Sequence, residues 1–367
     1  MNSNDPSLLD DDAFMMEDPI GYNDAVVGFF REKYAEHIES IFKKLKNRTD
    51  SEACPWLGES LPSVPKRIIE RHLFPVFAAA SCSGGISKHH LAFCSAFIRA
   101  ISIPLLRIDR RIDRPAIKRI EKQDSICKSQ NAQLIECCLF HDGFLDICRL
   151  PNGKEIMELV ASNYLQVYTS LYYEMMHRYS LDYLSNPKKK LQWIFRSRFS
   201  PLTCKYFSTT VQASILLNSK NVSSDIKKLT ESFGRLRQLC DQICDVEEDI
   251  TMGKVTIPVL YALLNDDGKL ASVVRTLWSE IQGFGSDLKP SVLSQHAAEI
   301  KEITQKLGGF RRAYRLADKW YRQAMSLIHK CNGKTGVGTE VKLLFRLKRA
   351  YLERLKCNNW VDIPNYY

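Results

Sequence analysis

No stretch of the 367-residue sequence is long and apolar enough to cross a membrane. A spanning helix needs about 18 or more consecutive apolar residues, and no run here reaches that length. The chain starts with an acidic segment that contains Asp10, Asp11 and Asp12, and it lacks the positive and apolar regions of a secretory signal peptide. We therefore expect a cytoplasmic protein with no stable membrane insertion.

The sequence also has little that predicts strands, repeats or structural metal binding. Its 12 cysteines include no Cys-x-x-Cys pair, which favours reduced thiols packed as small apolar side chains. No series of alternating apolar and polar residues predicts a sheet, and no internal repeat stands out. These absences argue against a β-sheet protein, a disulfide scaffold and a repeat array.

The net charge of +10 is compatible with an acidic or phosphorylated partner. Basic residues are spread over the whole chain, and no basic stripe is interleaved with aromatic side chains. Nucleic acid is therefore not the expected partner. The run Pro187–Lys190, with its three lysines, is expected to form a solvated turn.

Long apolar patterns with a helical period dominate the chain, 45% of which is hydrophobic. We expect an all-α fold with a disordered acidic tail over residues 1–18 and a single helical domain over residues 19–367. Examples of the predicted helical segments are Tyr22–Leu45, Lys66–Ala80, Lys88–Ile108, Lys154–Tyr179, Phe199–Leu217, Asp225–Val246, Leu270–Ile281, Ile300–Cys331 and Glu340–Leu355.

The most informative motif is a pair of carboxylates, Asp241 and Asp245, on a predicted helix. Residues four apart project from the same helix face. Gln238 precedes the pair, and the segment Gly253–Pro258, which contains Lys254, follows where the helix should end. Carboxylates beside a cation suit a Mg²⁺–phosphate ligand. Alone, however, such a pair is common on surface helices.

A second pair, Asp109 and Asp113, lies upstream with the same spacing. Pro115 should end or kink its helix, and two basic residues, Lys118 and Arg119, follow. Taken alone, these aspartates and the arginines among them would be interpreted as a surface ion-pair network. The joint occurrence of two such motifs favours a shared site.

Together these motifs resemble those of the isoprenyl diphosphate synthases (the trans-prenyltransferases), over roughly residues 65–265. That family carries two DDxxD motifs on facing helices of an all-α bundle around a central cavity. In the family a basic pair follows the first motif and Gly-Lys-x-Thr-x-Pro follows the second. The resemblance implies the isoprenoid-synthase-like fold, a homodimer, a prenyl diphosphate substrate and Mg²⁺ as cofactor.

The resemblance also assigns residue roles. It implies catalytic carboxylates at Asp109, Asp113, Asp241 and Asp245, of which the first three are the expected metal ligands and Asp245 stands behind them or adds a ligand. The expected diphosphate-binding residues are Lys118, Arg119, Arg198, Lys254, Gln238 and Arg71.

The chain departs from the family pattern at several positions. Arg110 and Gln242 replace the second aspartate of each motif. Phe74 and Ser102 stand where an arginine and a histidine of the second-substrate site are expected. The preferred interpretation is a terpene synthase (cyclase) that ionises one prenyl diphosphate. A chain-elongating prenyltransferase that uses isopentenyl diphosphate is the alternative, and a non-catalytic subunit of such a synthase is a further one.

Two subsidiary expectations concern neighbouring residues. The pair Asp142 and Asp146 also resembles a first motif, but placing the motif there would leave Asp109 and Asp113 without roles. Cys240 and Cys244 are expected to pack behind the aspartates. The aromatic residues that would shield a carbocation, unless they only pack the core, are Phe93, Phe97, Tyr168, Tyr172, Phe195, Phe199 and Phe207.

Overall fold

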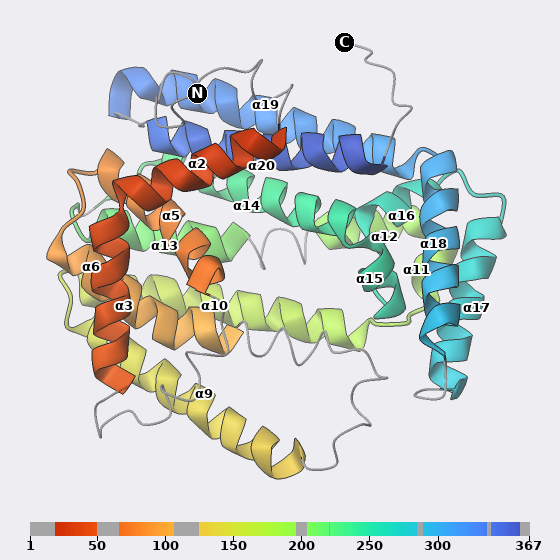
Figure 1. The fold of residues 1–367 in the computed structure, drawn as a ribbon, viewed down its shortest axis with the longest axis horizontal. Coiled ribbons are helices and arrows are strands. Elements are labelled where there is room, and N and C mark those ends of the chain that lie inside the picture. The colour runs from red at the N-terminus through yellow and green to blue at the C-terminus, as the bar shows by residue number, and fades with distance from the viewer. Residues whose placement is uncertain are drawn as a thin grey trace.

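All regular structure in the described part of the chain is helical, as the computed structural model in Figure 1 shows. The structure describes residues 19–49, 66–105, 125–195, 204–219, 221–284, 289–335 and 339–359. The expected all-α class is confirmed. Within these ranges no helix combines the length and the apolar character that a membrane span requires.

The first half of the chain supplies α2 (Pro19–Lys33), α3 (Ala35–Thr49), α5 (Lys66–Cys82), α6 (Lys88–Phe97), the π-helical turn η3 (Ile98–Ser102), α9 (Ser125–Cys148), α10 (Gly153–Met176), α11 (Asp182–Ser185) and α12 (Pro187–Ile194). The second half supplies α13 (Lys205–Leu216), α14 (Ser224–Cys244), α15 (Val246–Thr251), α16 (Ile257–Leu263), α17 (Lys269–Phe284), α18 (Pro290–Lys306), α19 (Gly309–Thr335) and α20 (Thr339–Asn359).

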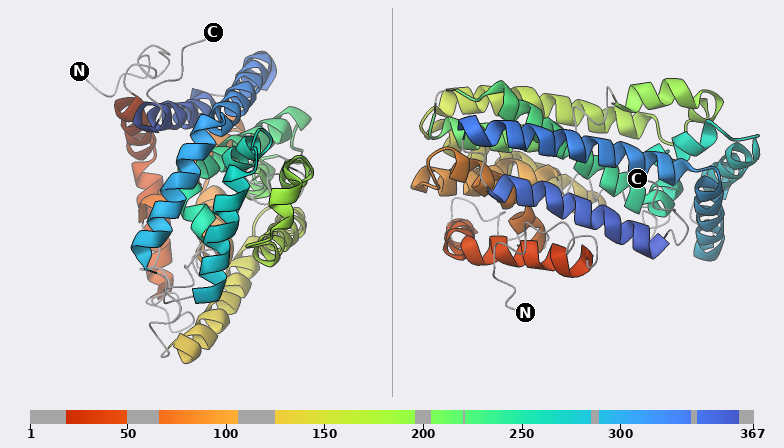
Figure 2. Two further views of the ribbon diagram at one scale, coloured as in Figure 1. Left: turned by 90° about the vertical axis from the view of Figure 1, so that its right-hand side faces the viewer. Right: turned by 90° about the horizontal axis from the view of Figure 1, so that it is seen from above.

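Helix α14 lies at the centre of the bundle. It packs against α13, α16, α19 and α20, while α10 packs against α13 and α9. Figures 1 and 2 show α2, α19 and α20 grouped along one side of the molecule, with α17 and α18 standing upright at one end. A large cluster of buried apolar side chains joins these layers. The second acidic motif therefore ends a helix that is anchored on several sides.

Two predicted helices are each divided in the structure. The segment predicted over Tyr22–Leu45 breaks at Tyr34, between α2 and α3. The segment predicted over Ile300–Cys331 ends at Lys306 and restarts at Gly309, because Gly308 adopts a positive φ of 75° that few residues except glycine take without strain. Apolar periodicity continues through both breaks, so it could not reveal them.

A glycine fixes the turn that follows α15. Gly253 has a φ of 77°, and a Cβ added there would lie 2.7 Å from the ring of Tyr179. The Gly253 carbonyl also accepts a hydrogen bond from the backbone N–H of Tyr179 (2.9 Å). A side chain at this position would therefore be strained and would clash. This close approach holds the neighbouring Lys254 against the end of α10.

Candidate metal and diphosphate site

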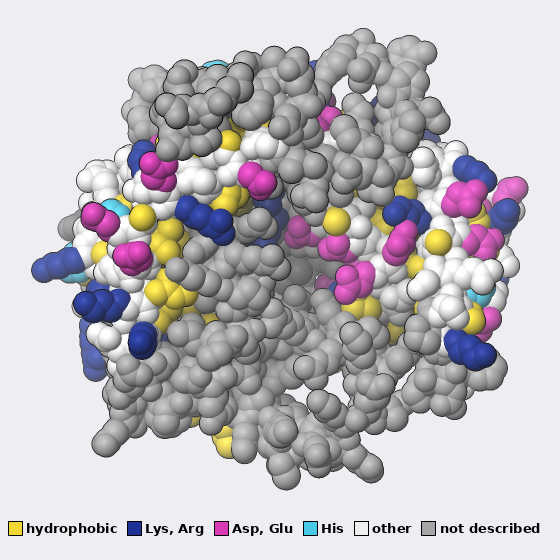
Figure 3. All heavy atoms as spheres, in the orientation of Figure 1, with side chains coloured by type: hydrophobic (Ala, Val, Ile, Leu, Met, Phe, Trp, Pro, Cys, Tyr) yellow, Lys and Arg dark blue, Asp and Glu magenta, His cyan; other side chains and the backbone are white. Residues whose placement is uncertain are grey.

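Acidic side chains gather where α14 ends and α15 begins. In the space-filling view, acidic groups lie near the middle of one face over these two helices (Figure 3). Asp241 lies in the last turn of α14 with its side chain 45% exposed, and Asp245 is the residue at the end of that helix. Partial burial raises the pKa of the Asp245 carboxyl group, and the charges of Asp241 and Glu248 raise it further. These carboxylates therefore repel one another, which a bound cation would relieve.

The donor atoms at this position suit a hard cation. Carboxylate oxygens are the ligands that Mg²⁺ prefers, and one or two of them suffice when phosphate oxygens complete the shell. Within the described ranges, no group of three or more His, Cys, Asp or Glu residues is placed to hold a metal ion by itself. Asp241 and Asp245 thus fit one half of a magnesium–diphosphate site. Asp109 and Asp113, which the sequence predicts for the other half, lie outside the described residues.

Lys254 is buried beside two carboxylates from other helices. Its Nζ lies 3.0 Å from Glu174 Oε1 on α10 and 3.6 Å from Asp249 Oδ1 on α15. Its backbone N–H donates to the Asp249 carbonyl (2.9 Å). Sequence analysis did not identify Glu174 or Asp249 as partners. The charge of Lys254 also lowers the pKa of Asp245, so the lysine acts on the acidic end of α14.

A pocket with about 350 Å³ of empty space, part of it open solvent, adjoins Lys254. Lys190 lines it and is not the solvated turn residue that the sequence predicts, because it is buried in α12. Its Nζ lies 3.1 Å from the ring centroid of Tyr183 and 3.4 Å from that of Trp193. Contact with two aromatic faces stabilises an ammonium group held away from water.

The two glutamines of α14 are buried. Gln242 replaces the second aspartate of the motif, and its Oε1 accepts the backbone N–H of Ile257 at the start of α16 (3.1 Å). This side chain therefore ties the acidic end of α14 to the helix that follows Lys254. Gln238 is buried one turn before the acidic pair. Cys240 is buried as expected, whereas Cys244 is exposed, so the prediction that both pack behind the aspartates is wrong for Cys244.

An arginine that sequence analysis missed lies beside Asp241. Arg237 is one helical turn earlier on the same face of α14, and its Nε lies 3.8 Å from Asp241 Oδ2. Its guanidinium carbon lies 4.9 Å from the ring centroid of Phe207 on α13. The spacing of four residues from Asp241 was available in the sequence, but the aromatic support from another helix was not.

The expected second-substrate positions have apolar or neutral surroundings. Phe74 is buried and stacks on Phe30 of α2, with ring centroids 4.8 Å apart. Ser102 is buried, and its hydroxyl lies 2.9 Å from the hydroxyl of Tyr206. Arg71 belongs to α5, but its side chain lies outside the described part, as do the whole residues Lys118, Arg119 and Arg198.

The competing acidic pair has a structural role. Asp142 and Asp146 on α9 both pair with Arg99, a buried arginine of η3, and the Arg99 Nη2–Asp146 Oδ2 distance is 2.6 Å. A Cβ on Gly143 would lie 2.5 Å from the Ala96 carbonyl oxygen, so α9 approaches α6 closely here. These aspartates neutralise a buried charge between packed helices, which is not the environment of a metal–diphosphate site.

The aromatic residues that were expected to shield a cation differ in their burial. Phe93 and Phe97 are buried, and Phe97 contacts the rings of Tyr164 and Tyr206 within the bundle. Tyr172 is 57% exposed, so its predicted place in a cavity is wrong. Tyr168 and Phe195 are partly buried against the core, and Phe199 lies outside the described residues.

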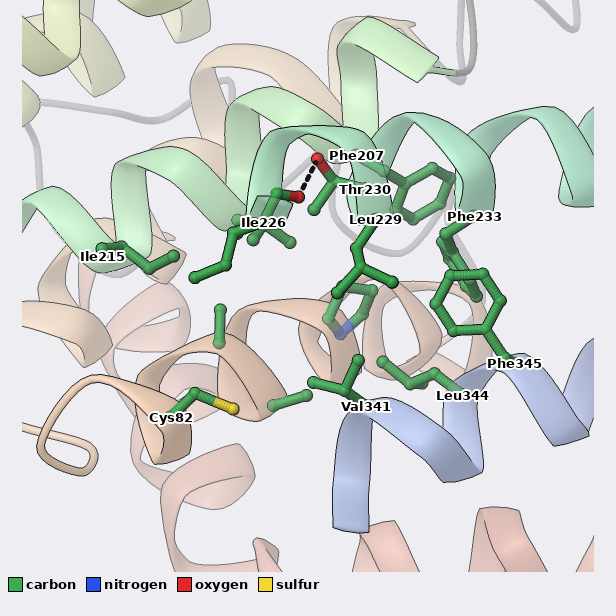
Figure 4. A pocket seen from close by; sticks show the side chains of 14 residues that line it. Cys82, Phe207, Ile215, Ile226, Leu229, Thr230, Phe233, Val341, Leu344 and Phe345 are labelled. Carbon is green, nitrogen blue, oxygen red and sulfur yellow. Dashed lines mark hydrogen bonds between the residues drawn. The ribbon is translucent and has the colours of Figure 1, made fainter. Parts of the chain in front are cut away.

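Phe207, the last of these aromatics, lines an apolar pocket among α5, α13, α14 and α20 (Figure 4). The pocket has about 530 Å³ of empty space, part of it open solvent. Thr230 is its single hydroxyl-bearing lining residue, and that hydroxyl donates to backbone carbonyls of its own helix. Phe233 and Phe345 form part of the wall, with ring centroids 5.4 Å apart.

Neither a protein-family model nor a curated protein matches this sequence. Solved structures do match. A decaprenyl diphosphate synthase from Rhodobacter capsulatus is 17% identical, with a TM-score of 0.62 over 90% of this chain and 99% of that one. A polyprenyl synthase from Caulobacter crescentus CB15, complexed with calcium and isoprenyl diphosphate, is 16% identical, with a TM-score of 0.65 over 89% and 98%. A geranylgeranyl pyrophosphate synthetase from Pyrococcus horikoshii Ot3 is 17% identical, with a TM-score of 0.64 over 90% and 99%.

These similarities define the fold. The chain has the fold of the isoprenyl diphosphate synthases and covers nearly the full length of each of these structures. The expected isoprenoid-synthase-like fold is thereby confirmed.

Proposed function

We propose that this protein is a Mg²⁺-dependent enzyme acting on prenyl diphosphates, most simply a chain-elongating prenyltransferase. The observation that carries the proposal is the acidic end of α14, with Asp241, Asp245 and the nearby Lys254, on the fold of the isoprenyl diphosphate synthases. One structure of that fold was solved with calcium and isoprenyl diphosphate. Other solved structures with this fold are named as decaprenyl or geranylgeranyl diphosphate synthases. Their names favour a chain-elongating activity over the cyclase activity that the sequence first suggests.

The proposed chemistry assigns a role to each described residue. Asp241 and Asp245 would hold Mg²⁺ together with Asp109 and Asp113, and the bound metal would offset the charge of the departing diphosphate. Lys254 would bind a diphosphate oxygen, and the ligand would compete with the Glu174 carboxylate for the Lys254 ammonium group. Gln242 keeps the turn that carries Lys254 in register with α14. Gln238 supports the same helix face, while Lys118, Arg119, Arg198 and Arg71 are proposed as further diphosphate-binding residues.

Cyclisation of a single prenyl diphosphate is the second candidate function. It is favoured by the environments of Phe74 and Ser102, because neither position offers a cation for a second diphosphate. Without that charge, binding of isopentenyl diphosphate would depend on other residues. A non-catalytic subunit is the third possibility, motivated by Arg110 and Gln242.

The test is an incubation of the purified protein with Mg²⁺ and geranyl, farnesyl or geranylgeranyl diphosphate, each with and without isopentenyl diphosphate. We expect longer prenyl diphosphates only when isopentenyl diphosphate is present. Hydrocarbon or alcohol formed without it would show a terpene synthase instead. No turnover by the wild-type protein on any of these substrates would refute the enzymatic proposal, and Asp109→Ala controls show whether turnover depends on the first motif.

We also propose that the protein forms a homodimer through α9 and α10, which pack against each other. Leu165, Tyr172 and Met176 share one face of α10 and are 70%, 57% and 64% exposed. Leu145 on α9 is 59% exposed. Several large apolar side chains exposed on one helix face are typical of a surface that binds another protein subunit. Light scattering should give a dimer mass that Leu165→Glu reduces to a monomer, whereas Leu264→Glu, at an isolated exposed leucine, should not. A monomeric wild-type protein would contradict this.

A further inference from the structure

We infer that Arg237 is a diphosphate-binding residue of this site, an inference that rests on the proposed function. Arg237 is one turn before Asp241 on the same face of α14. Its side chain is 27% exposed, so it is partly accessible to a ligand from solvent. None of the motifs singled out in the sequence includes it.

The packing around Arg237 orients the guanidinium group. Its carbon lies 4.9 Å from the ring centroid of Phe207, and that ring is in turn held edge-on by Phe233, with centroids 5.1 Å apart. A guanidinium that lies on an aromatic face keeps its N–H groups directed outward around its rim. Side-chain entropy is therefore already reduced before a ligand arrives.

The contact with Asp241 explains how Arg237 would join a diphosphate. The Nε–Oδ2 separation of 3.8 Å is long for a hydrogen bond, and Asp241 is nearly half exposed, so the pair is loosely held. If Asp241 takes part in metal binding, its carboxylate would be drawn to the cation, and the adjacent guanidinium would be available to the phosphate oxygens of the same ligand. Arginine binds phosphate through two parallel N–H groups, which gives a stronger contact than a single neutral hydrogen bond.

A chain of side-chain contacts also connects Arg237 with Ser102, whose hydroxyl has a neutral partner. The Ser102 hydroxyl contacts the Tyr206 hydroxyl (2.9 Å), and the Tyr206 ring lies 5.2 Å from that of Phe207, which supports Arg237. A continuous line of contacts thus runs from η3 through α13 to the acidic end of α14. Arg237 places a cation on this line, where the sequence offers none at Ser102.

Calorimetric titration with inorganic diphosphate at fixed Mg²⁺ tests the inference without turnover. We expect Arg237→Gln to weaken binding about 10- to 100-fold, because it removes a charge-assisted contact. Arg235→Gln is the matched control, since Arg235 lies on the same helix and is 3.9 Å from Glu231. It should bind like the wild-type protein. Arg237→Lys should recover part of the affinity that Arg237→Gln loses. If the role of Arg237 were purely structural, the two variants would bind diphosphate equally well when compared at the same folded fraction.

Two further arms complete the experiment. Titrations with isopentenyl diphosphate and with a non-hydrolysable geranyl thiolodiphosphate show which diphosphate Arg237 contacts. The contacted ligand is the one that Arg237→Gln binds more weakly than the wild-type protein does. If Arg237→Gln unfolds, Arg237→Met keeps the apolar stem on Phe207 and still removes the charge. Equal diphosphate affinity in a folded charge-free variant and in the wild-type protein would overturn the inference. A wild-type protein that binds no diphosphate would instead remove the proposed function itself.

Discussion

Replacing Asp241 with asparagine should lower kcat/KM for prenyl diphosphate turnover by about 100-fold or more. Asparagine keeps the size of the side chain but removes the charge that would hold Mg²⁺ against the departing diphosphate. Steady-state kinetics at several Mg²⁺ concentrations measure the effect. Because metal affinity falls with the lost charge, the variant should require more Mg²⁺ than the wild-type protein to reach its own maximal rate.

This loss should not reflect unfolding. The charges of Asp241 and Glu248 both raise the pKa of Asp245, so removing the Asp241 charge relieves repulsion at the end of α14. The contact that is lost, with Arg237, is long and partly exposed and contributes little to stability. Thermal unfolding should therefore be almost unchanged. Asp225→Asn, in the first turn of the same helix, is the control. Wild-type kinetics in Asp241→Asn would show that turnover does not use this site.

The sequence predicts local features of this molecule well. Apolar periodicity predicts many of the described helices, although it does not reveal the breaks at Tyr34 and Gly308. The proximity of Asp241 and Asp245 follows from a spacing of four residues at the end of one helix. The end of α14 at Cys244 agrees closely with the predicted Asp225–Val246 segment. These features depend on neighbours within a few residues, which is the range over which sequence patterns carry information.

Contacts between distant helices account for what the sequence did not predict. Glu174 on α10 becomes the partner of Lys254 only when α10 packs beside the turn that follows α15. Phe207 lies on α13, and only the packing of α13 against α14 shows that it supports Arg237. Such partners depend on how whole helices pack, so neither composition nor periodicity can identify them.

The buried ion pair of Lys254 and Glu174 leads to the second large effect. Lys254→Met should lower the free energy of unfolding by about 3 kcal/mol, because it leaves the Glu174 carboxylate buried without its main cation. Their side chains are only 7% and 9% exposed, so water cannot replace the lost partner easily. Urea denaturation measures the change through the midpoint at constant slope. The same variant should also bind inorganic diphosphate more weakly, if Lys254 contacts that ligand.

A second substitution separates the two roles of Lys254. Lys254→Met combined with Glu174→Gln removes the uncompensated charge, so most of the lost stability should return while diphosphate binding stays weak. Lys306→Met, which breaks an exposed pair with Glu302 on α18, should hardly change stability. If Lys254→Met were as stable as the wild-type protein, the buried pair would not be holding the turn after α15 against α10. If the double variant regained diphosphate affinity together with stability, Lys254 would serve the fold and not the ligand.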